Sequence, residues 1–455
     1  MKFTRHEIAE AVGGTLLGQD GLVIGVTIDS RDVPPGSLFV PIVGQRDGHD
    51  FIEAALRAGA SAWFTSLLPD DLASSMDAPA YEGAIVVGDT AIALQRLGSY
   101  ARTRITSNVI GVTRSTGKTS TKDLIGGVLL TGGPAAVSVK SFNNELGVPL
   151  TLSNAPDNCV NAVIEMGARG RGHIAMLCEI ARPTIGVITN IGMAHRELFG
   201  STEATAHAKG ELLESLPDDG TAVLNADDAM LSVLRSKAKC SALTFSASRN
   251  RTADVFATRV VLDAELRASF VMSTPWGSAD VTLHARGSHQ VDNALAGACA
   301  TLAAGFALPD VVAGLATDSL SPWRMEFHRL KNGAVILNDA YNANPASMRA
   351  GLSALAATPA ARHIAVLGTM AELGGDAPGM HREIGEFAHE LEIDSVIAVD
   401  EPAYGATAVS GVDEALALLN RLGAPGPGDA ILVKGSRIAG LEVLAKRLID
   451  EGVQS

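Results

Sequence analysis

The chain has 455 residues, of which 47% are apolar and 19% are charged; this composition is that of a globular protein and excludes a disordered one. Lysine and arginine number 36 against 50 aspartates and glutamates, and the net charge of −14 excludes a broad surface for nucleic acid or anionic membrane. At roughly 150 residues per domain, the length corresponds to about three domains.

The chain carries the signals of a cytoplasmic protein. Its first residues lack the apolar segment of a signal peptide, and its longest uncharged stretch, residues 294–308, is shorter than the ~20 residues that span a bilayer. The four cysteines form no CxxC pair, and scattered single cysteines are typical of a reducing compartment. We therefore expect a cytoplasmic monomer without a membrane span.

Residues 1–107 predict a small α/β domain. Short strands are expected at residues 23–28, 37–41 and 84–87, and an alanine-rich helix at residues 51–58.

Residues 108–318 alternate apolar runs with helical stretches, the pattern of a parallel sheet with crossover helices. Residues 253–286 instead alternate apolar and polar side chains around Pro275-Trp276-Gly277, which predicts antiparallel hairpins. The expected buried strands are residues 109–113, 162–166, 185–191 and 222–225. This zone therefore predicts a mostly parallel central sheet with an antiparallel part.

Residues 319–455 predict a third α/β domain in which a helix follows each strand. Asn344-Pro345 marks one helix start, because proline suits the first helical turn. The expected strands are residues 334–338, 363–367, 395–399 and 431–433.

A phosphate-binding loop follows the first strand of the central zone. The strand runs into Gly117-Lys118-Thr119, where a helix begins, and the N–H groups of a helix start suit phosphate oxygens. The hydroxyl of Thr119 lies where such loops supply a ligand to Mg²⁺. The usual spacing requires glycine at position 112, which is Val112, while Gly111 comes one residue early. The loop alone therefore does not separate a kinase, a GTPase and a ligase.

Two neighbouring strand ends carry further chemistry. Glu165 ends one apolar strand and His195 follows the next, and at the carboxyl edge of a parallel sheet they would lie beside the phosphate loop. Together they predict a divalent metal site. Taken alone, each has a structural alternative, a turn cap for Glu165 and a core residue for His195. Lys209, in Ala208-Lys209-Gly210-Glu211, would ordinarily be a solvated helix residue.

An ordered set of short motifs runs along nearly the whole chain. In chain order these are Thr27-Ile28-Asp29-Ser30-Arg31, the Gly-Lys-Thr loop, Asn143-Asn144-Glu145-Leu146-Gly147, Glu165-Met166-Gly167-Ala168, Ala208-Lys209-Gly210-Glu211, Arg324-Met325-Glu326, Asp339-Ala340-Tyr341-Asn342-Ala343-Asn344-Pro345 and Lys434-Gly435-Ser436-Arg437. In this order and content the chain resembles the Mur ligases, the ATP-dependent amide-bond-forming enzymes of peptidoglycan precursor synthesis. The resemblance implies a P-loop-type central ATPase domain, an N-terminal domain for a UDP-linked substrate and a Rossmann-like C-terminal ligase domain.

The resemblance also implies the reaction and its small-molecule partners. ATP and Mg²⁺ would be the cofactors, and an acyl phosphate the intermediate. The paired asparagines at 143–144 and the run from Tyr341 to Pro345 favour the member that adds D-alanyl-D-alanine to UDP-N-acetylmuramoyl-tripeptide. No nucleic-acid partner is implied.

Site residues follow from the resemblance, position by position. Nucleotide contacts are implied for Gly111, Thr113, Arg114, Ser115, Thr116, Gly117, Lys118, Thr119, Ser120, Asn293, Arg324 and Asp339. Substrate contacts are implied for Thr27, Asp29, Ser30, Arg31, Asn143, Asn144, Tyr341, Asn342 and Asn344. Catalytic roles are implied for Lys118, Glu165, His195 and Lys209, and metal binding for Thr119, Glu165, His195 and Lys209, the last as a carbamate.

Two residues depart from the family pattern. Arg114 replaces the middle glycine of the family's loop, and Thr369 stands where the family usually has an acidic residue. If position 114 required a positive φ, arginine would cost on the order of 1–2 kcal/mol. Its side chain could also fill space that the triphosphate uses, point outward or add a phosphate contact.

Two alternative hypotheses about the function stay open. The chain could be a catalytically weakened relative that binds a UDP-sugar peptide or a partner protein, or a paralogous ligase that joins a different amine. Residues 29–31 could form no more than a turn with a surface salt bridge.

Overall fold

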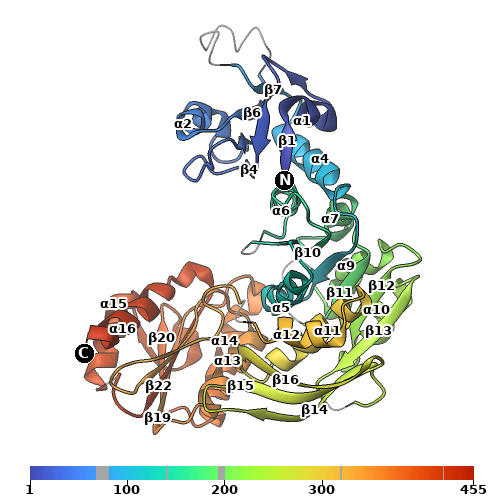
Figure 1. Cartoon of the computed structure of the whole chain (residues 1–455). Coiled ribbons are helices and arrows are strands. Elements are labelled where there is room, and N and C mark those ends of the chain that lie inside the picture. Colours follow the sequence, from blue (N-terminus) through green and yellow to red (C-terminus); the bar gives the residue numbers. More distant parts are fainter. Residues whose placement is uncertain are drawn as a thin grey trace.

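The computed structural model of the chain describes residues 1–67, 81–139, 142–192, 200–248, 250–317, 320–423 and 425–454. Its strands form sheets of five, nine and six strands, together with one two-stranded ribbon. In Figure 1 the N-terminal part lies at the top, the central part below it, and the C-terminal part beside the central one. The predicted class of three successive α/β domains is confirmed.

The N-terminal sheet has the strand order β2-β7-β6-β5-β4, in which only β2 runs antiparallel to its neighbour. The elements are β1 (Lys2–Thr4), α1 (Arg5–Val12), β2 (Thr15–Leu16), β3 (Leu22–Ile24), β4 (Val26–Thr27), β5 (Leu38–Phe39), η1 (Gly48–Phe51), α2 (Ile52–Ala58), β6 (Ala62–Thr65), β7 (Ala84–Val86) and α4 (Thr90–Arg102). Five strands and α-helices of this domain were not predicted from the sequence: β1, α1, β2, β6 and α4. Thr4 and Glu7 form a capping box at α1, and Asp89 caps α4, so both helices had a start signal in the sequence.

The N-terminal domain packs on the central one through α4. A Cβ atom added at Gly98 of α4 would lie 2.5 Å from the Cα atom of Pro149 in α6 (Gly147–Ser153), so glycine permits this close approach. Asn154 extends the contact, because its side chain accepts from Val26 N at 2.8 Å and donates to Val26 O at 2.9 Å. One hydrophobic core therefore continues from the N-terminal domain to one face of the central sheet.

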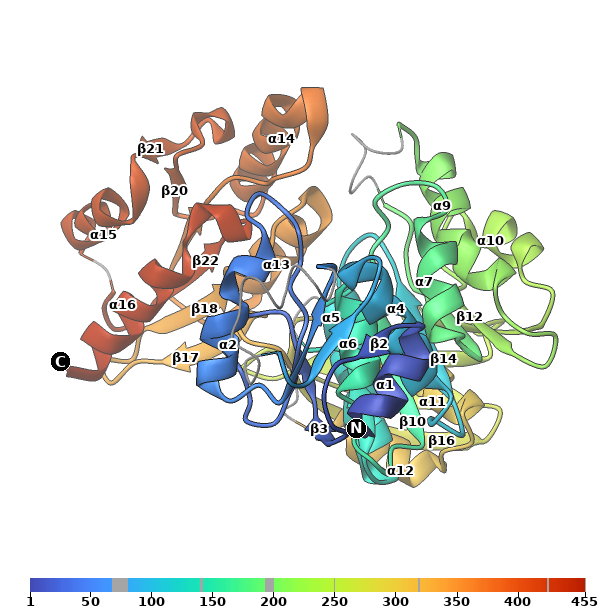
Figure 2. The same ribbon diagram turned by 90° about the horizontal axis from the view of Figure 1, so that it is seen from above.

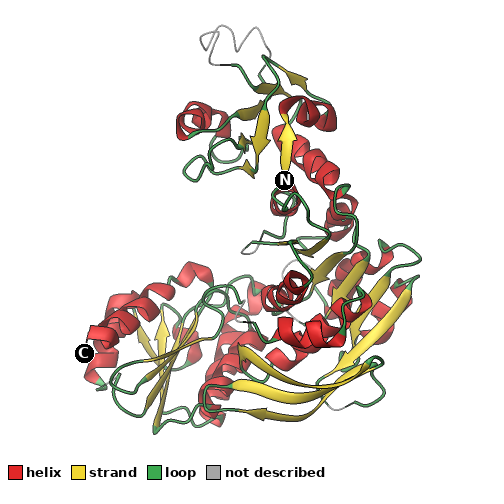
Figure 3. Ribbon diagram, viewed as in Figure 1, coloured by secondary structure: helices red, strands yellow, loops and turns green. Residues whose placement is uncertain are grey.

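The central sheet has the order β16-β15-β14-β13-β12-β11-β8-β10-β9. Its strands are parallel from β9 to β14, and β14, β15 and β16 are antiparallel, which confirms the predicted hairpins. The strands are β8 (Val109–Thr113), β9 (Ala135–Val137), β10 (Asn161–Glu165), β11 (Ile185–Ile188), β12 (Thr221–Asn225), β13 (Ser241–Ser246), β14 (Val255–Leu262), β15 (Arg267–Thr274) and β16 (Gly277–Arg286). Figure 3 shows β14, β15 and β16 as three long curved strands along the lower edge of this domain.

Helices cover both faces of the central sheet. The helices are α5 (Lys118–Thr131), α6, α7 (His173–Ala181), α9 (Thr202–Glu214), α10 (Leu231–Lys237), α11 (Gln290–Ala303) and α12 (Leu308–Leu315). A second core packs α5, α11 and α12 on the face opposite to the N-terminal domain. Strand β11 stops at Ile188, three residues before the prediction, because Asn190 O accepts from the phosphate loop at Ser115 N and Ile191 N donates to Asp228.

The C-terminal sheet has the order β17-β18-β22-β19-β20-β21 and is parallel except for β17. The elements are β17 (Glu326–Arg329), β18 (Val335–Asp339), α13 (Pro345–Ala357), β19 (Arg362–Leu367), η2 (Gly374–Asp376), α14 (Ala377–Glu390), β20 (Ser395–Val399), η3 (Pro402–Tyr404), β21 (Thr407–Val409), α15 (Gly411–Arg421), β22 (Asp429–Lys434), η4 (Arg437–Ala439) and α16 (Glu442–Gln454). Figure 2 shows β20 and β22 between α15 and α16 on one side and α13 and α14 on the other. The two faces have separate cores, as expected for a Rossmann-like sheet.

The connector between the central and C-terminal domains is held at both ends. Ser321 N donates to the Asp123 carboxylate on α5 at 2.7 Å, and Met325 N donates to Asp339 Oδ1 at the end of β18 at 3.2 Å. Trp323 and Met325 have positive φ values of 59° and 52°, so the backbone on both sides of Arg324 is strained. This connector brings the end of β18 to the phosphate loop.

No helix within the described ranges is long and apolar enough to cross a membrane.

Candidate active site

Two adjoining cavities lie between the central and C-terminal domains. The first, of about 270 Å³, is lined by residues that include Arg114, Ser120, Asn293, Asp339 and Lys434. The second, of about 660 Å³, is lined by residues that include Lys118, Thr119, Glu165, Asn342 and Asn344. Four residues line both cavities: Thr116, Gly117, Arg324 and Ser347. The turn of the phosphate loop is therefore the junction of the two cavities.

The loop turns at Gly117, the N-cap of α5, whose φ of 87° favours glycine. Lys118 folds back over the loop, where its Nζ donates to Arg114 O at 2.8 Å. Burial lowers the pKa of Lys118, and the nearby Glu165 charge opposes that shift. The loop therefore presents a cation and the first amides of α5 to the second cavity.

Oxygen atoms meet where β10 ends beside α5. Thr119 Oγ1 donates to Glu165 Oε2 at 3.1 Å, and Asn143 Nδ2 donates to Glu165 Oε1 at 2.9 Å. Arg324 Nη2 reaches Thr119 Oγ1 from the connector, at 3.1 Å. A hydroxyl and a carboxylate offer the hard oxygen ligands that Mg²⁺ prefers, so these residues fit such an ion.

Lys209 lies fully buried in α9. Its Nζ has no hydrogen-bond partner among the described residues, and burial holds the pKa of its amine well below the ordinary value. The positive charge of Lys118 is the second cause of that shift, so the two side chains interact electrostatically. Position 209 is thus not the solvated helix residue that its sequence context suggested. His195 lies outside the described residues, within 193–199.

Arg114 is turned inward and is only 6% exposed. Its Nη1 donates to Thr121 Oγ1 at 2.7 Å and to Asn293 Oδ1, so it connects the loop to α11. Arg114 is not among the non-glycine residues of the described chain with a positive φ, so the strain that the glycine-to-arginine change could have brought is absent there. Burial lowers the pKa of Arg114 to about 9, which leaves the guanidinium charged at neutral pH.

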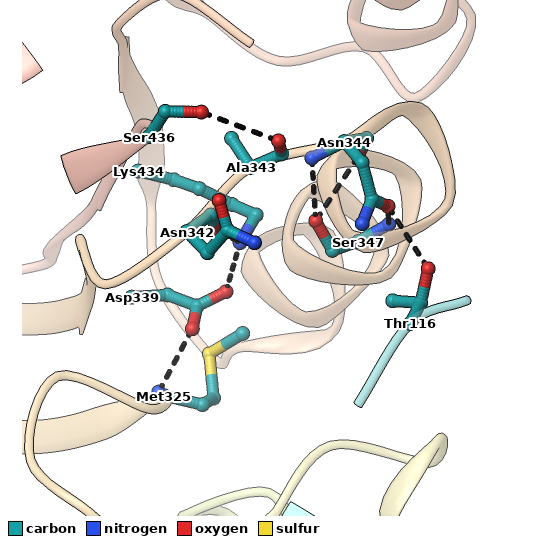
Figure 4. Close-up of polar contacts among 9 residues, drawn as sticks. All are labelled: Thr116, Met325, Asp339, Asn342, Ala343, Asn344, Ser347, Lys434 and Ser436. Carbon is teal, nitrogen blue, oxygen red and sulfur yellow. Dashed lines mark hydrogen bonds and ion pairs between the residues drawn. The ribbon is translucent and has the colours of Figure 1, made fainter. Parts of the chain in front are cut away.

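Separate groups of polar contacts form the C-terminal wall of the cavities (Figure 4). Asn344 caps α13, and its Oδ1 also accepts from Thr116 Oγ1 of the phosphate loop at 3.1 Å. Asp339 accepts from Met325 N and forms an ion pair of 2.5 Å with Lys434, whose side chain is 1% exposed. The guanidinium of Arg324 lies 4.2 Å from the centre of the Tyr341 ring. Side chains from the loop, the connector and β18 are therefore fixed relative to one another.

Replacing Asp339 by alanine is expected to lower the free energy of unfolding by about 3–5 kcal/mol, because it leaves the buried Lys434 cation without its partner. Denaturant-induced unfolding followed by circular dichroism measures this loss. The double variant Asp339→Ala, Lys434→Met should recover most of it. Equal losses in the single and double variants would show that the ion pair is not the cause.

Some predicted site residues lie outside both cavities. In the first domain, Arg31 donates to both carboxylate oxygens of Asp29 at 2.8 Å, and its side chain is 87% exposed, so the salt bridge of the alternative interpretation exists. Thr27 closes the same turn, since its Oγ1 accepts from Asp29 N at 3.1 Å. Ser30 lies in this turn as well. The cavities are lined by none of these four residues.

The remaining predicted positions serve the framework of the site. Asn144 Oδ1 accepts from Gly147 N at 2.8 Å, at the start of α6. Gly111 and Thr113 are buried in β8. Thr369 donates to Glu401 Oε2 at 3.4 Å, so a carboxylate lies beside the position where an acidic residue was expected.

Several side chains that line the cavities were not predicted from the sequence. Trp323 and Glu372 line the second cavity, and His289 and Asp292 line the first. Trp323 adjoins the Arg324-Met325-Glu326 motif and Asp292 adjoins the predicted Asn293, so both had a signal in the sequence, whereas His289 adjoins no predicted site residue. Burial lowers the pKa of His289 to about 4, which keeps this imidazole neutral at neutral pH.

A phosphate loop at the head of a parallel sheet, facing a third α/β domain across two joined cavities, defines a multidomain nucleotide-dependent α/β enzyme. Three family matches cover the chain: "Mur ligase family, catalytic domain" at residues 23–101, "Mur ligase middle domain" at 112–301 and "Mur ligase, glutamate ligase domain" at 323–437. The chain belongs to the Mur ligase family.

Relatives match over nearly the full length. The UDP-N-acetylmuramoyl-tripeptide–D-alanyl-D-alanine ligase of Mycobacterium tuberculosis is 38% identical, over 99% of this chain and 98% of the relative. The crystal structure of MurF from Acinetobacter baumannii has a TM-score of 0.87 at 31% identity and covers 99% of both chains. MurF of Thermotoga maritima, solved in complex with ADP, has a TM-score of 0.78 at 27% identity, over 94% of this chain and 98% of the other.

Proposed function

We propose that this chain joins D-alanyl-D-alanine to UDP-N-acetylmuramoyl-tripeptide, with cleavage of ATP to ADP and phosphate, in peptidoglycan precursor synthesis. The observation that carries the proposal is the second cavity, in which Lys118, Thr119 and Glu165 face Tyr341 and Asn342 of the C-terminal domain. The full-length similarity to the M. tuberculosis ligase supports the choice of substrates.

In the first step a carboxylate oxygen of the tripeptide attacks the γ-phosphorus of ATP. The bond from that phosphorus to its bridging oxygen breaks, ADP leaves, and an acyl phosphate forms. Two anions must approach each other, so neutralisation of charge matters more than proton transfer. Lys118 and Arg324 supply positive charge at the loop, and the amides that follow Gly117 orient the phosphates.

Magnesium is part of this proposal. Thr119 Oγ1 and the Glu165 carboxylate would hold the ion, with His195 and a carbamate on Lys209 as further ligands or supports. When bound there, Mg²⁺ supplies positive charge to the phosphate oxygens. Asn143 donates to Glu165 Oε1, which keeps the other carboxylate oxygen directed at Thr119.

In the second step the neutral amine of D-alanyl-D-alanine attacks the acyl carbon. The bond from that carbon to the phosphate oxygen breaks, phosphate leaves, and the new amide nitrogen releases a proton to solvent. Tyr341, Asn342 and Asn344 line the C-terminal side of the second cavity and are proposed to orient the dipeptide. Asn143 and Asn144 would approach the tripeptide from the central domain.

The UDP end of the substrate is assigned to the first domain. Thr27, Asp29, Ser30 and Arg31 form a turn there in which Arg31 is exposed and the other three are half-buried, and Arg31 is the cation that would meet a diphosphate. Because Asp29 neutralises Arg31 within the turn, diphosphate binding would require the guanidinium to exchange partners.

We further propose that the protein acts as a cytoplasmic monomer whose domains divide at 107/108 and 318/319. All four cysteines are free and buried, which suits a reducing compartment.

Phosphate release tests the proposal. The purified chain, ATP, Mg²⁺ and UDP-N-acetylmuramoyl-tripeptide should release phosphate only when D-alanyl-D-alanine is added, and the UDP-linked pentapeptide should accumulate in equal amount. A panel of single D- and L-amino acids in place of the dipeptide is the matched control. Phosphate release only with another amine would support the hypothesis of a paralogous ligase. No phosphate release from folded protein would support the hypothesis of a catalytically weakened relative.

A further inference from the structure

Arg114 is a buried cation of the phosphate loop to which the chemistry above gives no task. Its hydrogen-bond acceptors, Thr121 Oγ1 and Asn293 Oδ1, are both uncharged. Its Nε is buried without a hydrogen-bond partner among the described residues. The charges of Asp292 and Glu165 favour the charged guanidinium, but neither carboxylate accepts a hydrogen bond from it among the described residues. A buried charge is more stable with a counter-charge in direct contact.

The guanidinium lies against the turn that would hold phosphates. A Cβ atom added at Gly117 would stand 2.7 Å from Arg114 Nη2 and 2.8 Å from its Cζ. The side chain therefore packs on the Cα atom of the residue that opens α5, where backbone amides collect anions. It also lines the first cavity, so the cation is directed at a ligand space.

The arrangement of the two cavities determines which part of a bound nucleotide Arg114 would contact. Amide side chains and the carboxylates of Asp292 and Asp339 line the first cavity, and these groups suit the edge of a purine and the hydroxyls of a ribose. The second cavity is lined by Lys118, Thr119 and Glu165, and the acceptor substrate would bind there. A bound triphosphate would therefore run from the first cavity past Gly117 to the second. Arg114 stands before the turn, and Lys118 stands after it.

We propose that Arg114 neutralises the phosphate group nearest the nucleoside, as a second nucleotide-binding cation that this chain has in place of the family's glycine. This inference rests on the proposed function and specifies which end of the nucleotide each cation serves. Because the inner phosphates remain after transfer, Arg114 holds ADP as well as ATP. The contact of Arg114 with Asn293 keeps its guanidinium at the border between base and phosphate.

Binding measurements without turnover test the proposal. Titration calorimetry with adenosine, AMP and ADP, in EDTA and without Mg²⁺, compares the wild-type chain with Arg114→Gly and Arg114→Gln. The dissociation constants of AMP and ADP should rise by roughly 10-fold or more in both variants, as for loss of a charge-assisted hydrogen bond, while that of adenosine stays unchanged. Lys118→Ala, the comparison for the outer phosphates, should weaken ADP binding more than AMP binding.

Each of the other possible results would overturn a specific part of the proposal. If the substitutions weakened adenosine binding as much as AMP binding, Arg114 would be a residue that positions the base through Asn293. Tighter binding of AMP by Arg114→Gly would show that the side chain obstructs the cavity. Unchanged AMP binding would remove the inference alone, whereas a wild-type chain that binds neither AMP nor ADP would remove the proposed function with it. Melting temperatures identify a variant that fails to fold, and Arg114→Lys, which keeps the charge, should then retain most of the AMP affinity.

Discussion

Alanine at position 118 is expected to reduce ATP-dependent phosphate release by roughly 100- to 1,000-fold while the melting temperature stays nearly unchanged. Lys118 is half-buried, and its Nζ donates to Arg114 O, an acceptor on its own loop. The fold therefore depends little on this side chain. Phosphoryl transfer depends on it strongly, because the γ-phosphoryl group and the acceptor carboxylate are both anions.

The matched control is Lys239→Ala, which removes an exposed lysine of the same domain outside both cavities. Its turnover should equal that of the wild type. Steady-state phosphate release and thermal unfolding of both variants provide the comparison. Wild-type turnover in Lys118→Ala would contradict the assignment of the loop.

The parallel strands that were predicted in the central and C-terminal domains are mostly buried on both faces, whereas the short strands β9 and β21 were not predicted. Strand β8 is buried along its whole length, and so is β22, and a parallel strand of this kind appears in sequence as a continuous apolar run. The phosphate loop was predictable for a related reason, since its chemistry is concentrated in adjacent residues. Strand β6 shows the limit of this reasoning, because its four buried residues make a run too short to distinguish from a helix segment.

The contacts that assemble the site could not be read from local patterns. Arg114 meets Asn293 across 179 residues, and Thr116 meets Asn344 across 228. Such pairs depend on how the connector joins two domains, and Trp323 and Met325 adopt positive φ values there against their own preference. Sequence reasoning could therefore name Arg114 as unusual, but only the packing of α5 against α11 decides that its side chain turns inward.

Methionine at position 209 is expected to reduce phosphate release by at least roughly 100-fold, with a melting temperature equal to or above that of the wild type. The two effects have separate causes. Lys209 Nζ is a buried polar group without a hydrogen-bond partner among the described residues, so an apolar side chain of similar length removes a cost of about 1–3 kcal/mol. Activity falls because methionine cannot form the carbamate that is proposed to help hold Mg²⁺ beside the acceptor carboxylate.

The chemistry of that carbamate follows from burial. Burial lowers the pKa of Lys209 and so favours the neutral form of its amine, which is the form that attacks the carbon of CO₂. A nitrogen–carbon bond forms, one proton of the amine leaves to solvent, and the neutral amine becomes a carbamate anion. Removal of CO₂ and bicarbonate from the buffer should therefore lower the activity of the wild-type chain, and added bicarbonate should restore it. In Lys209→Ala, which leaves a space, acetate or formate should recover part of the activity, whereas in Lys209→Met, which fills it, they should not. Full turnover in Lys209→Met would make the buried amine a structural residue only, and activity independent of CO₂ together with an inactive Lys209→Met would assign the role to the amine itself.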